Sequence, residues 1–228
     1  MIRRLGNGQR LKTMRLVRLI LLWIVVRPSD SLMTIRSFQP RDIEAASFLA
    51  FNAWMAEDLP GYRPELGRFV YGYMARYYFR NSDYSRIASE DGASVDAFLL
   101  AYRPQDETSA DLWFEANIGL LQAEEQRIAT EYRTYLKTQT QRLSEAAQGH
   151  YLVAGLFVSC KKGAGAPLMQ KLLQQCEAEG YEALYLWADS ACNHTYYEKR
   201  GFEKVGYHRD CEFVDGQKFD IFVFRKTF

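Results

Sequence analysis

Residues 151–166 read YLVAGLFVSCKKGAGA, and their pattern indicates the fold class of the chain. Residues 151–158 form an almost continuous apolar run, which is typical of a strand buried on both faces. The glycine-bearing loop from Cys160 to Ala166 follows, and apolar residues then recur at helical spacing after Pro167. The stretch therefore predicts a buried strand, a tight loop and a helix in direct succession.

The residues that follow predict a parallel crossover. Gly180 ends the expected helix, and residues 183–188 form a second apolar run that suits a buried strand. A strand, a helix and a strand in this order predict two parallel strands joined by a right-handed connection.

The glycine loop is a candidate phosphate-binding site. Backbone N–H groups at the positive end of a helix can hold a phosphate, and Lys161 and Lys162 add charge. The loop lacks the Gly-Lys-Ser/Thr of a P-loop. It has Leu168 at the sixth position of a dinucleotide fingerprint, and Asp189 fits the acid of that fingerprint poorly. A tight turn without a ligand is the other interpretation.

A second motif, NHTYYEKRGF over residues 193–202, follows one predicted strand later. Together the motifs resemble those of the GCN5-related N-acetyltransferase superfamily, and the matching segments are Leu156–Val158, Gly163–Gly165 and Asn193–Phe202. In that superfamily a Leu-x-Val strand precedes a Gly-x-Gly/Ala loop, and an Asn…Tyr-x-x-x-Gly-Phe helix follows the next strand. The resemblance implies an α/β fold with a mixed, mostly antiparallel central sheet flanked by helices, in which the fourth and fifth strands splay apart.

The resemblance also implies acetyl-CoA as co-substrate. The backbone of Leu156, Phe157 and Val158 is expected to pair with the pantetheine arm, and one of their N–H groups to polarise the thioester carbonyl. The remaining cofactor contacts are expected from Lys162, Gly163, Ala164, Gly165, Ala166 and Asn193. A role for Asn193 as a helix N-cap is an alternative.

Tyr197 matches the general acid of the superfamily. A phenol with a pKa of about 10 stays protonated at neutral pH and can donate to a departing thiolate. The neighbouring Tyr196 points away from Tyr197 on a helix, so only one of the two can face the sulfur. The other interpretation of Tyr197 is a core tyrosine.

No motif assigns the base that deprotonates the incoming amine. Candidates by position are Glu57, Asp58, Glu115 and His150, and a chain of water molecules is another possibility. His194 and His208 lack metal-ligand spacing, so no metal site is predicted. Cys160 has no partner base, so a cysteine nucleophile is not predicted either.

The leading hypothesis is an N-acetyltransferase in which a primary amine, on a small molecule or a protein, attacks acetyl-CoA directly. Cys160 stands where the superfamily usually has Arg or Gln, and the loop after Val158 is shorter than usual. These departures motivate the alternative, a non-catalytic acyl-CoA-binding or protein-interaction module on the same fold.

One domain is expected over residues 33–228. Further strands are predicted at 34–38, 86–89, 95–102, 203–209 and 219–224. The last is a candidate aromatic edge strand that could pair in a homodimer. Helices are predicted from Pro40, from Pro64 and near 193–200. Residues 105–148 are expected to form a helical insertion beside the acceptor site, as one long helix or two.

The clearest helical periodicity follows Pro64. Its apolar stripe consists of Leu66, Phe69, Val70, Tyr73, Met74, Tyr77 and Tyr78. A stripe of this kind usually faces the core, although its aromatic rings could also line a ligand groove. We interpret it as core, with the tyrosine hydroxyls at the margin.

Composition limits the remaining classes. Of the 228 residues, 48% are hydrophobic and 25% are charged, which excludes a disordered chain, a collagen or a disulfide scaffold. The net charge of +1 gives no indication of a nucleic-acid partner. The four cysteines form no C-x-x-C pair and are expected to be reduced, as in a cytoplasmic protein.

Residues 1–32 differ from the rest. They combine basic residues with the apolar run from Leu19 to Val26, which is too short for a membrane span. A cleaved signal and an interfacial anchor are alternatives, and only such an anchor would imply a membrane partner. We favour Met33 as the natural start, with residues 1–32 as an extension outside the fold.

Overall fold

The computed structural model describes residues 33–228. The expectations for residues 1–32 lie outside the described residues. The side chains of residues 56–58 lie outside them as well, so the predictions for Glu57 and Asp58 stay untested.

A seven-stranded sheet forms the centre of the described chain, in the order β1-β2-β3-β4-β5-β7-β6. Its strands are β1 (Thr34–Ser37), β2 (Arg86–Ser89), β3 (Ala97–Tyr102), β4 (Tyr151–Ser159), β5 (Ala183–Asp189), β6 (Glu203–Glu212) and β7 (Lys218–Thr227). Neighbouring strands are antiparallel except for β4 and β5, which are parallel. The predicted mixed, mostly antiparallel sheet and its parallel crossover are confirmed.

Strands β4 and β5 separate along their length, as predicted. They pair only from Tyr151 and Ala183 to Val153 and Tyr185, although both strands continue well beyond these residues. On its other edge, β4 pairs with β3 along most of its length, with a register shift that leaves Gly155 as an extra residue. A bulge of this kind bends a strand, and here it lies where β4 leaves β5.

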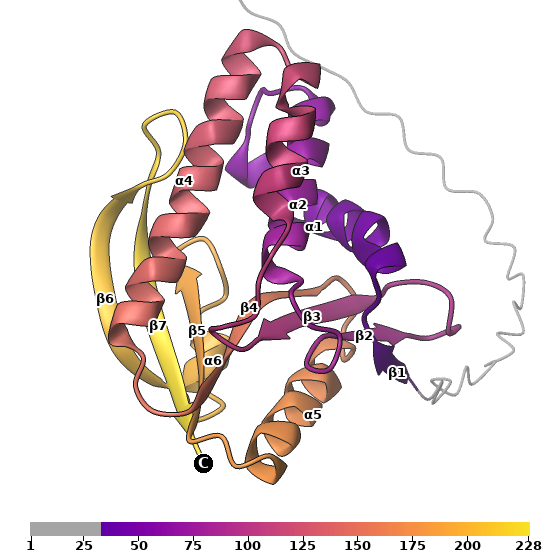
Figure 1. The fold of residues 1–228 in the computed structure, drawn as a ribbon, viewed down its shortest axis with the longest axis vertical. Helices are drawn as coiled ribbons and strands as arrows, with labels where there is room; N and C mark the ends of the chain where they lie inside the picture. Colours follow the sequence, from indigo (N-terminus) through magenta and orange to yellow (C-terminus); the bar gives the residue numbers. More distant parts are fainter. Residues whose placement is uncertain (1–32) are drawn as a thin grey trace, which may run out of the picture. The chain divides into compact units, whose positions relative to one another are not determined.

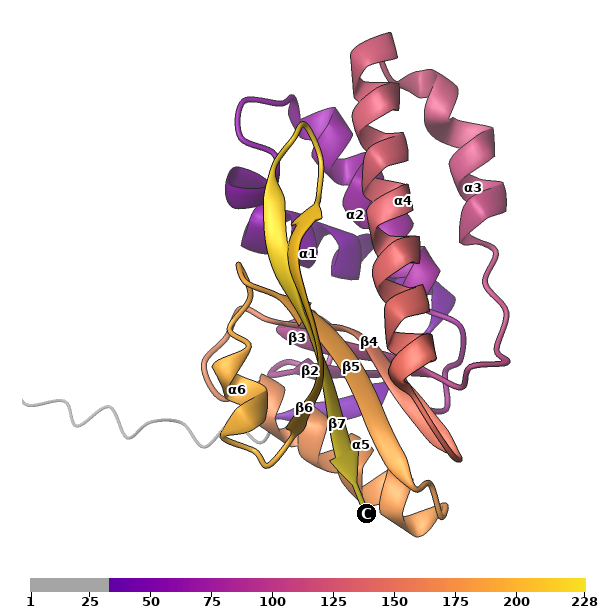
Figure 2. The ribbon, with the colours of Figure 1, turned by 90° about the vertical axis from the view of Figure 1, so that its left-hand side faces the viewer.

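Helices cover both faces of the sheet. They are α1 (Ile43–Asp58), α2 (Pro64–Tyr78), α3 (Ala110–Asn117), α4 (Ala123–Ala146), α5 (Gly165–Ala178) and α6 (Thr195–Glu198), with 3-10 turns at Pro40–Asp42 and Ile118–Leu120. Figures 1 and 2 show α1, α2 and α4 on one side of the sheet and α5 on the other. Alternate residues of β3 and β4 accordingly contribute to two separate hydrophobic clusters.

The segment between β3 and β4 forms two helices, α3 and α4, rather than one. The start of α4 has a capping box, in which the Glu125 carboxylate accepts from the Gln122 backbone N–H over 3.1 Å. Arg63, the N-cap residue of α2, donates two hydrogen bonds to the same carboxylate over 2.8 and 2.6 Å. This pair ties the starts of α2 and α4 together, and α4 then runs past β5 and the β6–β7 hairpin.

Two details of the sequence prediction are wrong. The apolar stripe of α2 is core as expected, but the Tyr78 hydroxyl is fully buried rather than marginal, because α4 and β4 cover this face of α2. The aromatic strand β7 is not an edge strand, because it lies between β5 and β6. The apolar residues of β7 are therefore buried within the sheet, and its edge strands are β1 and β6.

Candidate active site

A cavity of about 100 Å³ lies where β4 and β5 diverge. Its walls come from four helices, α1, α2, α4 and α5, and from the strands β4 and β5. The turn after β5, the short helix α6 and the β6–β7 turn complete them. The lining residues are Trp54, Met74, Tyr78, Tyr132, Tyr135, Leu136, Ala154, Gly155, Leu156, Phe157, Met169, Trp187, Ala188, Asp189, Ala191, Cys192, Tyr197 and Phe213. The helical insertion therefore contributes directly to the cavity, through α4.

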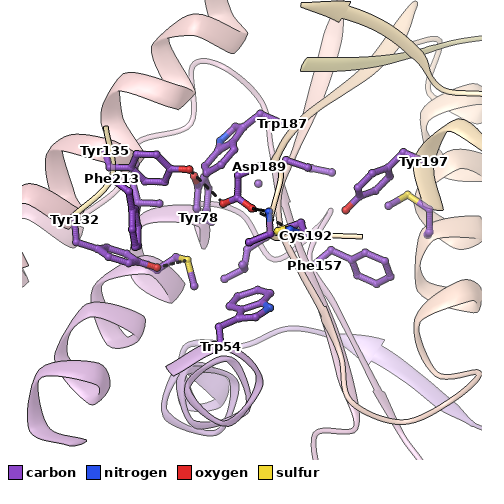
Figure 3. Close-up of a pocket in the computed structure, with 18 residues that line it drawn as sticks. Trp54, Tyr78, Tyr132, Tyr135, Phe157, Trp187, Asp189, Cys192, Tyr197 and Phe213 are labelled. Atoms are coloured by element: carbon purple, nitrogen blue, oxygen red, sulfur yellow. Dashed lines mark hydrogen bonds between the residues drawn. The ribbon is translucent and has the colours of Figure 1, made fainter. Parts of the chain in front are cut away.

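Tyr197 lines this cavity from α6. Its ring packs between Phe202 and Phe224, with centroids 5.7 and 5.6 Å away. Figure 3 shows its hydroxyl pointing toward the side on which Asp189 and Cys192 lie. Burial raises the pKa of Tyr197, which keeps the phenol protonated. Tyr197 thus presents a protonated phenol at the wall of the cavity.

The predicted strand residues lie along the opening. Leu156 and Phe157 line the cavity, whereas Val158 is buried and does not line it. Beyond Val153, the edge of β4 that faces β5 pairs with no strand in the described chain. A β-carbon on Gly155 would lie 2.3 Å from Cδ1 of Tyr78, so the bulge requires glycine.

The glycine loop lies outside the cavity, at the start of α5. Gly163 has a φ of +89°, and no side chain caps the first turn of α5. The N–H groups of that turn are thus free of a capping side chain. Lys161 pairs with Glu90, whereas Lys162 is exposed and has no ion-pair partner within residues 33–228.

Ala164, Gly165 and Ala166 join this loop to the helix. Ala164 and Gly165 are buried and Ala166 is exposed. A β-carbon on Gly165 would lie 2.8 Å from Cζ of Phe157 and 2.9 Å from Cβ of Ser159. Gly165 therefore lets the start of α5 approach β4, which brings the loop next to the divergent strands.

Asn193 is exposed, and its Oδ1 accepts a hydrogen bond from the Thr195 hydroxyl over 3.0 Å. The N-cap position of α6 is His194, so the alternative N-cap role of Asn193 is wrong. That role would require α6 to begin at His194, whereas the helix begins at Thr195. Cys160 is exposed as a residue, but neighbouring atoms partly desolvate its thiol and raise its pKa, which does not favour a thiolate nucleophile.

Two predicted base candidates lie away from the cavity. His150 precedes β4 and stacks on Tyr181, with ring centroids 4.3 Å apart. Glu115 pairs with Arg133 between α3 and α4. Neither residue lines the cavity. The positions of both residues in the sequence suggested that they lie near the site. In the structure, His150 lies next to the end of β4 that pairs with β5, opposite the end where the two strands diverge.

Asp189 is a further residue of this site, and the sequence motifs did not predict it. Asp189 is the last residue of β5 and lines the cavity. Its Oδ1 accepts the backbone N–H groups of Ala191 and Cys192 over 3.1 and 3.0 Å. Its Oδ2 accepts the Tyr135 hydroxyl over 3.2 Å. The sequence signal that could have identified Asp189 is an acidic residue at the end of a buried strand, just before the motif that begins at Asn193.

The described residues contain no cluster of three or more His, Cys, Asp or Glu that could hold a metal ion. Within the same residues, none of the helices has the length and apolar character to cross a membrane.

Solved structures share this fold, and an agmatine N-acetyltransferase and a GCN5-related N-acetyltransferase are among them. SsHAT aligns over 86% of this chain and 98% of its own, with 16% identity and a TM-score of 0.56. An agmatine N-acetyltransferase variant in its apo form aligns over 86% and 99%, with 10% identity and a TM-score of 0.54. A GCN5-related N-acetyltransferase from Kribbella flavida aligns over 86% and 98%, with 14% identity and a TM-score of 0.51.

Neither the protein-family models nor the curated proteins provide a match. The structural likeness at this low identity establishes the architecture. The chain has the GCN5-related N-acetyltransferase fold, as the motifs around Gly163 and Tyr197 predicted.

Proposed function

We propose that this protein transfers an acetyl group from acetyl-CoA to a primary amine. The observation that carries the proposal is the separation of β4 from β5 beyond Val153, with Tyr197 lining the cavity between the strands. The fold shared with solved N-acetyltransferases supports the same activity.

The residues around the opening fit acetyl-CoA. The free edge of β4 offers backbone groups at Leu156, Phe157 and Val158 to the amides of the pantetheine arm. The first turn of α5, which lacks a side-chain cap, offers N–H groups to the pyrophosphate. Lys162 supplies an exposed positive charge beside Gly163, and Asn193 provides an exposed side-chain amide just before α6.

The chemistry requires a proton donor and a proton acceptor. Acetyl-CoA supplies the acetyl group as a thioester. The amine nitrogen forms a bond to the acyl carbon as the carbon–sulfur bond breaks, and Tyr197 donates its phenolic proton to the departing sulfur. The amine attacks in its neutral form, so an incoming ammonium first loses one proton to water. After the nitrogen bonds to the acyl carbon it loses a second proton to water, and water returns one proton to Tyr197. A backbone N–H of β4 stabilises the charge that develops on the acyl oxygen.

Calorimetry with acetyl-CoA and desulfo-CoA, and NAD as the comparator, tests this proposal. We expect micromolar binding of both CoA compounds, no binding of NAD, and release of free CoA when an amine is added. Binding without release across an amine library would instead favour the acyl-CoA-binding module. Absence of CoA binding would overturn both and leave an interaction module on the same fold.

A further inference from the structure

The described walls of the cavity combine many apolar side chains with one carboxylate. Among the lining residues whose side chains the structure describes, Asp189 is the only Asp or Glu, and none is Lys, Arg or His. An ammonium group can therefore enter without meeting a like charge. A carboxylate or phosphate on the same molecule would find no cationic partner there, and its burial without one is costly.

Asp189 is held in place by three hydrogen bonds, yet it can accept more. Backbone N–H groups occupy one oxygen, and the Tyr135 hydroxyl contacts the other. A carboxylate has about four lone-pair positions, so one position is left for an ammonium donor. The side chain is half-buried, which strengthens such a charge-assisted bond relative to one in water.

Aromatic rings lie on both sides of Asp189 in the cavity. Figure 3 shows Tyr132, Tyr135 and Phe213 on one side of Asp189, and Tyr197 and Phe157 on the other. Phe213 packs edge-on against both tyrosines, with centroid distances of 5.5 Å to Tyr132 and 4.9 Å to Tyr135. These contacts fix the rings before any ligand binds.

Further contacts make the aromatic wall continuous. The ring of Trp187 meets Tyr135 edge-on at 5.8 Å. The Tyr132 hydroxyl contacts Sδ of Met74 at 3.5 Å. Trp54 closes the cavity from α1. Such walls favour apolar groups, and their ring faces also attract cations.

We propose that the acceptor is a primary amine carried on a compact apolar group, with its ammonium bound to Asp189 and its carbon skeleton against Tyr132, Phe213 and Trp54. The inference rests on the proposed function, since it names the substrate class of the same site. The cavity is smaller than the roughly 150 Å³ that holds benzene in an engineered protein cavity. The group is thus a short branched alkyl chain or a single ring that extends toward the opening.

The test compares isopentylamine and phenethylamine with putrescine and glucosamine in acetyl-CoA turnover. We expect the better apolar amine to exceed both polar amines at least tenfold in kcat/KM. Asp189→Asn retains the Oδ1 acceptor for the two backbone N–H groups, so it preserves the local structure. It should raise the KM of the apolar amine on the order of 10- to 100-fold and leave acetyl-CoA affinity unchanged.

Asp111→Asn is the matched control, because Asp111 also accepts a tyrosine hydroxyl, that of Tyr73 over 3.1 Å, but does not line the cavity. It should leave the KM of the amine unchanged. A preference for putrescine or glucosamine, or an equal effect of the two substitutions, would overturn the inference while acetyl transfer stands.

Calorimetry with the same amines, in the presence and absence of desulfo-CoA, separates this inference from the proposed function. Binding of an apolar amine that Asp189→Asn weakens supports the amine site even if CoA does not bind. Absence of amine binding under both conditions, in a protein that binds acetyl-CoA, shows that the substrate class is wrong.

Discussion

The hydroxyl of Tyr135 donates a hydrogen bond to Oδ2 of Asp189 over 3.2 Å. The bond joins the long helix α4 to the last residue of β5, inside the cavity that the divergent strands create. Burial and the neighbouring carboxylate raise the pKa of Tyr135, so the phenol remains a donor to Asp189. The helical insertion thereby positions a carboxylate of the cavity, the one found among its described side chains.

Tyr135→Phe should raise the KM of the acceptor amine about fivefold, with a small effect on kcat, because one neutral-to-charged hydrogen bond that orients Asp189 is lost. Steady-state kinetics with the preferred amine measure the effect. Tyr73→Phe is the matched control, since it removes a tyrosine–aspartate bond outside the cavity. Equal changes in the two variants would show that Tyr135 has no positioning role.

Tyr197→Phe should lower kcat on the order of 10²- to 10⁴-fold and leave acetyl-CoA affinity unchanged, because a general acid acts on the leaving group and not on binding. Burial raises the pKa of Tyr197, so its ionisation should not reduce kcat between pH 6 and about 9. Tyr196→Phe is the control, since the Tyr196 hydroxyl is buried without a partner among the described residues. If Tyr197→Phe retains full turnover, another donor protonates the thiolate.

Lys162→Ala should weaken acetyl-CoA binding several-fold, and the difference from the wild type should shrink as salt is added. Lys162 is exposed beside Gly163 and has no ion pair within the described chain, so its charge is available to a phosphate. Lys161→Ala should have a smaller effect, because Lys161 already pairs with Glu90. Calorimetry at two salt concentrations distinguishes the variants, and the opposite ranking would assign the phosphate contact to Lys161.

Gly155→Ala should reduce the free energy of unfolding by about 1–3 kcal/mol, because the added carbon would lie 2.3 Å from the Tyr78 ring and 2.8 Å from the Tyr102 ring. Gly119→Ala is the control, since a β-carbon there meets no atom within 4 Å. Urea unfolding of both variants measures the difference. A Gly155→Ala protein as stable as Gly119→Ala would mean that the bulge accepts a side chain by a small shift.

Glu125→Gln should destabilise the fold most at neutral pH. The Arg63 guanidinium holds the pKa of Glu125 below its usual value, so the folded state favours the carboxylate. Its contribution is present above the unfolded pKa of about 4.3 and is lost as the pH falls through the lower folded value. The wild type and Glu125→Gln should therefore converge in unfolding free energy below about pH 4.

Urea unfolding across pH 3 to about 7 measures this convergence. Glu107→Gln provides the control, because Glu107 is exposed and forms no ion pair with any residue of 33–228. It should remain close to the wild type at each pH. A constant gap between wild type and Glu125→Gln would show that the Arg63 pair does not control the titration.

The local features of the site could be predicted from the sequence. The apolar run of β4, the glycine turn at Gly163 and the start of α5 are consecutive in the chain, so short-range periodicity and turn chemistry determine them. The same holds for α6 with Tyr197, which the superfamily motif identified. The prediction of Tyr197 rested on that resemblance, through the spacing from Tyr197 to Gly201 and Phe202 in the chain.

The contact between Tyr135 and Asp189 could be identified only in the tertiary structure. Tyr135 and Asp189 belong to different elements, and they meet only because α4 packs across β5. For the same reason, Glu115 and His150 were credible bases in the sequence and lie elsewhere in the fold. The segment from β4 through the glycine loop to the start of α5 could be predicted from the sequence, because its residues are neighbours along the chain. The pairing of Tyr135 with Asp189 depends on helix packing, since contacts between distant residues depend on how whole faces of α2, α4 and β5 are buried against one another.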